Sequence, residues 1–100
     1  MDAKKAIAVL NFQIEESKKL SGHVGWAAEV KKWQRDTEIA IEKIFGEGTR
    51  HLKDFKKIHY SSNIMIGGMD DRIHQQDCAE GLIEAQQILQ SMVEEISNMG

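Results

Sequence analysis

Residues 26–60, WAAEVKKWQRDTEIAIEKIFGEGTRHLKDFKKIHY, decide the fold of this chain. Their apolar positions recur every three or four residues, which places them on one face of a helix: Trp26, Val30, Trp33, Thr37, Ile41 and Ile44. Gly46 suits the left-handed residue that closes such a helix, because glycine has no Cβ to clash. Thr49 then suits the N-cap of a second helix. The stretch therefore predicts a long amphipathic helix, a sharp turn and a short basic helix.

Two further helices are predicted outside this stretch. Residues 2–20 begin with Asp2 as a cap and carry Ala3, Ile7, Leu10 and Ile14 along one face, widened by Val9 and Phe12. Residues 71–97, capped by Asp70 or Asp71, carry a heptad-like seam of Leu82, Ala85, Leu89, Met92 and Ile96. Gly81 in that helix would let another helix approach closely. Ile83, Ile88 and Val93 lie off the seam and add apolar surface.

These segments predict an all-α fold, a small four-helix bundle-like domain that covers residues 1–100. The absence of proline supports long uninterrupted helices. We expect helices at about 2–20, 24–45, 49–58 and 71–97, with the two long ones antiparallel. The segment SSNIMIGGMDD, which starts at residue 61, is expected to be the longest loop.

Composition bounds the functional class only loosely. Hydrophobic residues make up 41% and charged residues 29% of the chain, with a net charge of -3 and a single cysteine. Residues 1–60 hold twelve Lys or Arg against nine Asp or Glu, and residues 61–100 hold one against seven. Neither a signal peptide nor a membrane span is expected, so the prediction is a cytoplasmic protein with no membrane or nucleic-acid partner.

The predicted apolar surface exceeds what one small core requires, so we expect a homo-oligomer. The surplus residues are Val9, Phe12, Ile64, Ile66, Ile83, Ile88 and Val93. Trp26 and Trp33 are expected on the core face, and one of them could instead mark a subunit contact.

The best candidate for a binding site is basic. Phosphate groups bind to guanidinium and ammonium donors, and a nucleotide base stacks on an aromatic ring. Both occur in the predicted ligand-binding set Arg50, His51, Lys53, Lys57, His59 and Tyr60, to which Lys56 adds a further cation. The alternative interpretation is a solvated cationic face of a short amphipathic helix. No phosphate loop of recognised spacing accompanies the set.

Catalytic, metal and cofactor sites are not predicted. His74 and Cys78 are four residues apart and could reach one ion, but a closed zinc site needs two more ligands. The same pair lacks an orienting group for a nucleophilic enzyme. The simpler interpretation is that Cys78 is a small buried residue.

Three segments together suggest a family. They are Trp33-x3-Thr37-x3-Ile41-x2-Ile44-Phe45-Gly46-Glu47, then Phe55-x2-Ile58-x-Tyr60, and finally Gly81-Leu82-x2-Ala85-x3-Leu89-x2-Met92-x-Glu94-Glu95-Ile96. The combination resembles the small helical region that accompanies TIR-like and other nucleotide-binding domains in prokaryotic immunity and prophage proteins. The resemblance covers roughly residues 26–96. Because such proteins continue into a second domain, it implies either a fragment or a stand-alone version.

The sequence leaves three functional classes open. The first is a non-enzymatic oligomeric interaction module related to prokaryotic and phage immunity proteins. The second, suggested by analogy with small phage proteins, is a sponge that sequesters an anionic nucleotide signal on the basic helix. The third is a small metal-dependent or Cys/His enzyme, for which the required groups are incomplete.

Overall fold

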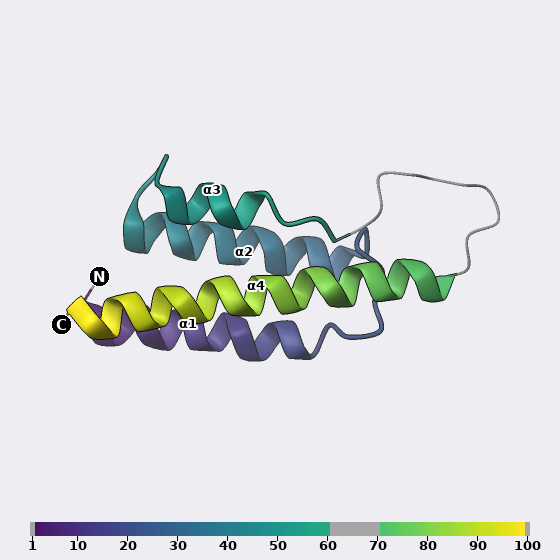
Figure 1. The fold of residues 1–100 in the computed structure, drawn as a ribbon, viewed down its shortest axis with the longest axis horizontal. Helices are drawn as coiled ribbons and strands as arrows, with labels where there is room; N and C mark the ends of the chain where they lie inside the picture. Colours follow the sequence, from purple (N-terminus) through teal and green to yellow (C-terminus); the bar gives the residue numbers. More distant parts are fainter. Residues whose placement is uncertain (1, 61–70, 100) are drawn as a thin grey trace.

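The computed structural model describes residues 2–60 and 71–99, which form four α-helices and no strand (Figure 1). The helices are α1 (Ala3–Lys18), α2 (Ala28–Phe45), α3 (Arg50–Lys56) and α4 (Asp71–Met99). The predicted all-α class is therefore confirmed. None of the helices in these two ranges is both long enough and apolar enough to cross a membrane. The predicted loop with Ile64 and Ile66, and the alternative cap Asp70, lie outside the described residues.

Helix α1 packs against both α4 and α2, and α3 packs against α2 and α4. The two long helices α2 and α4 run in the same direction, so the prediction that they are antiparallel is wrong (Figure 1). Trp26, before α2, contacts His74 near the start of α4, with ring centroids 4.9 Å apart. At the other end, Phe45 stacks on His51, which bonds to Glu95 near the end of α4. The directions agree because α3 carries the chain back along α2 before α4 begins.

The ends of the first three helices follow from their capping residues. The Asp2 carboxylate accepts a hydrogen bond from the backbone N–H of Lys5 at 2.8 Å, which confirms the predicted cap. Gly46 ends α2 with φ of +102°, a conformation that L side chains rarely adopt. Thr49 occupies the N-cap position of α3, but its hydroxyl donates to the Gly46 carbonyl at 3.0 Å. The Thr49 position was predicted correctly, while its hydrogen bond serves the turn before α3.

The core face of α2 agrees with its predicted spacing, except at its first member. Val30, Trp33, Thr37 and Ile41 are buried, and Ile44 is half-buried. Trp26 is 47% exposed, so its predicted place on the core face is wrong. Helix α2 begins at Ala28 and not near residue 24, because a turn that joins the Val24 carbonyl to the Ala27 N–H precedes it. Trp26 therefore lies outside the periodicity of the helix.

Helix α4 carries the predicted seam, with four members buried and Ile96 half-buried. Val93 is also buried, so its prediction as surplus surface is wrong; Ile83, 53% exposed, fits that prediction. Gly81 does permit a close approach, although by the segment after α3 and not by another helix. A Cβ at Gly81 would lie 2.6 Å from the backbone oxygen of His59 and 2.8 Å from a ring carbon of Tyr60.

Candidate functional site

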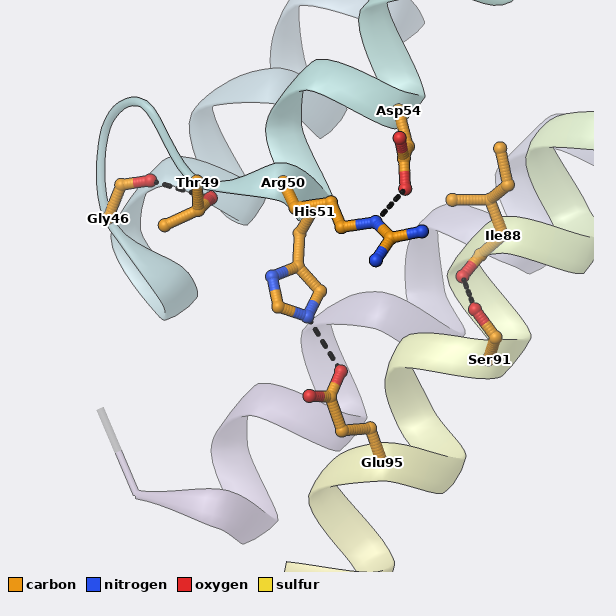
Figure 2. Close-up of polar contacts among 8 residues, drawn as sticks. All are labelled: Gly46, Thr49, Arg50, His51, Asp54, Ile88, Ser91 and Glu95. Atoms are coloured by element: carbon orange, nitrogen blue, oxygen red, sulfur yellow. Dashed lines mark hydrogen bonds and ion pairs between the residues drawn. The ribbon is translucent and has the colours of Figure 1, made fainter.

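The predicted basic site lies on α3 and on the residues that follow it. Arg50, Lys53 and Lys57 are exposed, and so is His59. The Arg50 Nε lies 3.7 Å from the Asp54 carboxylate one turn further along (Figure 2). An exposed ion pair of this kind contributes little to stability and is readily exchanged for another anion. Arg50, Lys53 and Lys57 therefore form an accessible surface, which we call the positive edge.

His51 has a different environment from these cations. Its ring stacks on Phe45, with centroids 3.8 Å apart and planes 5° apart. Its Nε2 lies 2.6 Å from the Glu95 carboxylate, so the side chain joins α3 to α4 (Figure 2). With one ring face against Phe45 and one nitrogen at Glu95, His51 serves to connect helices and is poorly placed to bind a ligand.

Tyr60 is buried in the core, where its ring meets Trp33 edge to face at a centroid distance of 6.1 Å. Burial raises the pKa of the Tyr60 hydroxyl well above its usual value. The ring also lies against Gly81 of α4. The predicted role of Tyr60 in stacking on a base is therefore corrected, because a base could reach the ring only if the core opened.

Acidic groups offset part of the positive charge at this end of the protein. A hydrogen bond with Glu47 raises the pKa of the Glu42 carboxyl, which means that the two carboxyls lie close together. Lys56 acts on Glu42 in the opposite sense, so this cation also lies near the acidic pair. Lys56 is consequently not grouped with the positive edge formed by Arg50, Lys53 and Lys57.

A groove between α1 and α2 was not predicted from the sequence. It encloses about 370 Å³, near the lower end of the range usual for ligand pockets. Its floor consists of buried or nearly buried side chains, Gln13, Leu20 and Trp33. Its α1 edge carries Phe12, Glu16 and Lys19, and its α2 edge carries Glu29, Lys32 and Asp36. We call this feature the α1–α2 groove.

The floor of the α1–α2 groove is held by hydrogen bonds between the two helices. The Trp33 indole N–H donates to the backbone carbonyl of Gln13 at 2.9 Å. The Thr37 hydroxyl donates to the Gln13 side-chain oxygen at 3.0 Å. Both donors come from the buried face of α2, and buried hydrogen bonds of this kind fix the relative position of the elements they join. The floor is therefore preformed.

The edges of the α1–α2 groove carry charges of both signs. Lys19 pairs with Glu16 at 2.7 Å, and the hydrogen bond to Glu16 raises the pKa of the Lys19 ammonium. Lys32 pairs with Asp36 at 2.9 Å. Phe12 interrupts this polar edge and is 58% exposed. The groove thus combines a mainly apolar floor, a charged rim and one exposed aromatic ring.

A second groove of about 470 Å³ lies where α4 passes α1, and a small cavity of about 60 Å³ lies where α2 meets α3. The second groove is lined mainly by polar side chains, around Ile14 and the exposed Ile83. Within the described ranges, none of these three cavities is lined by Arg50, His51, Lys53 or Lys57.

His74 and Cys78 are both buried, which confirms the prediction that Cys78 is a small buried residue. Burial raises the pKa of the Cys78 thiol, which disfavours the thiolate needed for nucleophilic attack or metal binding. The His74 ring packs edge-on against Trp26. Across residues 2–60 and 71–99, no three His, Cys, Asp or Glu side chains are grouped so that they could hold a metal ion.

Comparison with known proteins adds no relative. No protein-family model, no curated protein and no solved structure matches this chain. The resemblance to helical regions of prokaryotic immunity proteins therefore stays a prediction that rests on the motifs within residues 26–96.

Proposed function

We propose that this protein is a non-enzymatic helical interaction module that associates with further copies of itself. The observation that carries the proposal is Phe12, which is 58% exposed at the edge of a preformed groove with Trp33 in its floor. An exposed aromatic side chain beside an apolar concavity is typical of a protein interface. Further large apolar side chains are exposed on α2, on α4 and before α2: Ile39, Ile73, Ile83 and Trp26.

The proposal predicts association that depends on concentration. In sedimentation velocity over about 1–100 µM, the range of weak specific interfaces, the average mass should rise above that of an 11.3 kDa monomer. The rise should persist at high salt, because burial of apolar surface is screened far less than the attraction of exposed charges. A single monomeric species over the whole range would contradict the proposed function.

A second candidate function, the sequestering of an anionic nucleotide, is favoured by the exposed cations Arg50, Lys53 and Lys57. Each charge-assisted hydrogen bond to a phosphate contributes about 1.5–3 kcal/mol. The buried position of Tyr60 leaves only His59 as an exposed ring in the predicted set, so specificity for a base would be weak.

Titration calorimetry against cyclic and ADP-ribose-type nucleotides tests this second candidate. Replacing Arg50 and Lys53 together by alanine should weaken binding at least about tenfold, which is 1.4 kcal/mol. The matched control replaces Lys4 and Lys5, two exposed cations on α1, and should leave the affinity unchanged. Equal losses of affinity in both double variants would indicate non-specific electrostatic attraction. If no nucleotide of the panel produced heat, this second candidate function would be rejected for these nucleotides.

A further inference from the structure

We infer that the α1–α2 groove is a two-fold interface, in which Phe12 of each copy inserts into the groove of the other. The inference rests on the proposed self-association and assigns it to one surface. In a two-fold contact the same patch of both subunits meets, so that patch must contain both the protruding group and the cavity that receives it. The α1–α2 groove meets this requirement, because Phe12 lies on its edge and Trp33 and Leu20 lie in its floor.

Phe12 does not fill the groove that it borders. Its side chain remains more than half exposed, although the Trp33 and Leu20 side chains beside it are buried or nearly so. An aromatic side chain buries about 150–250 Å² when it is fully covered, which makes it a strong interface anchor. A second molecule can cover this ring, and an opposing groove offers it an apolar floor that is already assembled.

The charges on the groove edges are of both signs, which makes the surface compatible with a second copy of itself. Lys19 and Lys32 supply two positive charges, while Glu16, Glu29 and Asp36 supply three negative ones. Each rim therefore carries both signs of charge and a net charge of only −1. When two such rims meet across a two-fold axis, a lysine of one copy can approach a carboxylate of the other.

The direct test compares Phe12→Ser with the matched control Ile83→Ser. Both positions are more than half exposed apolar side chains, but Ile83 lines the groove between α1 and α4. Sedimentation should show that Phe12→Ser raises the dimer dissociation constant at least about a hundredfold, because two-fold symmetry removes two anchors at once. The control should change it by less than about threefold, as expected of a surface substitution away from the interface.

The outcomes separate this inference from the proposed function. A native protein that stays monomeric overturns both. A native protein that associates, together with an unaffected Phe12→Ser variant, overturns the inference alone and moves the interface elsewhere. Loss of association in Ile83→Ser but not in Phe12→Ser would assign the interface to the groove between α1 and α4. Circular dichroism should show that each variant retains its helices.

A second measurement uses the native sequence. The chain contains three phenylalanines, of which Phe12 is exposed, Phe45 is half-buried and Phe55 is buried. In protein labelled with fluorophenylalanine, the Phe12 fluorine resonance should move on dilution, while that of Phe55 stays fixed as an internal reference. A Phe12 resonance that does not move while sedimentation reports dissociation would overturn the inference without any substitution.

Discussion

Replacing Trp33 by alanine is expected to lower the free energy of unfolding by about 3–5 kcal/mol, a large part of what a small domain possesses. Trp33 is 5% exposed, and its ring lies within 5.8 Å of the Phe55 ring and 6.1 Å of the Tyr60 ring, between centroids. Its N–H also bonds to the Gln13 carbonyl of α1. The substitution therefore opens a cavity where α1, α2 and α3 meet and removes a hydrogen bond between two of them.

Urea denaturation at a single protein concentration measures this loss, since association would otherwise shift the apparent stability. Trp26→Ala is the matched control: its ring is 47% exposed and precedes α2, so the expected loss is below about 1 kcal/mol. Trp33→Phe should lie between the two, because it keeps most of the ring and loses the hydrogen bond. Similar losses for Trp33→Ala and Trp26→Ala would mean that the core is centred elsewhere.

Replacing Gly81 by leucine is expected to lower the free energy of unfolding by about 3 kcal/mol or more, because the added side chain overpacks the core. A side chain at Gly81 would collide with the His59 backbone oxygen, 2.6 Å from the new Cβ, and with the Tyr60 ring. Helix propensity alone predicts the opposite sign, because leucine in place of glycine favours a helix by about 1 kcal/mol. Urea denaturation measures this change: a lower free energy of unfolding supports the packing of the segment after α3 on α4, and a higher one contradicts it.

Gly81→Ala provides a graded companion to this variant, because its single Cβ already meets the same atoms. Its loss should be smaller than that of Gly81→Leu but of the same sign. Gln87→Leu, on the exposed side of α4, is the control for adding a leucine to this helix and should change stability by less than about 0.5 kcal/mol. A Gly81→Ala protein that is more stable than the native one would contradict the close approach of the His59 backbone oxygen, which lies 2.6 Å from the position of the added Cβ.

The helices could be predicted from the sequence because apolar spacing reports directly which side of a helix is buried. Leu10 and Ile14 on α1, and Leu82 and Leu89 on α4, are buried as their three-and-four spacing requires. The same pattern failed at Trp26, because a matching interval says nothing about where the first helical turn begins. The turn between Val24 and Ala27 decides that, and Gly25 is its only obvious signal.

The relative direction of α2 and α4 could not be predicted from the sequence of either helix. An antiparallel pair is the usual consequence of a short connection, and the chain between α2 and α4 contains a helix of its own. Buried polar residues were missed for a related reason. Gln13 is a polar residue, and only its contacts with Trp33 and Thr37, which are 20 and 24 residues away in the chain, explain its burial.

The two candidate sites differ in how far they could be predicted. Arg50, Lys53 and Lys57 are three and four residues apart, so their exposure followed from the amphipathic pattern of the short basic helix. The burial of Tyr60 depended instead on its packing against α4. The α1–α2 groove forms only when two helices come together, with Phe12 from one and Trp33 from the other. Phe12 was expected to add apolar surface to the first helix, but the sequence contained no indication that a cavity would lie beside it.

The packing of α1 against α4 also bears on how the protein folds during synthesis. Helix α1 is synthesised before α4 and buries Leu10 and Ile14 beside it, although α4 seam residues such as Leu89 are added some seventy-five residues later. A chain whose early and late elements pack together exposes apolar surface until the later element appears. A nascent chain that has not yet extended through α4 would hold α1 only through α2, so the core can close only after α4 has left the ribosome.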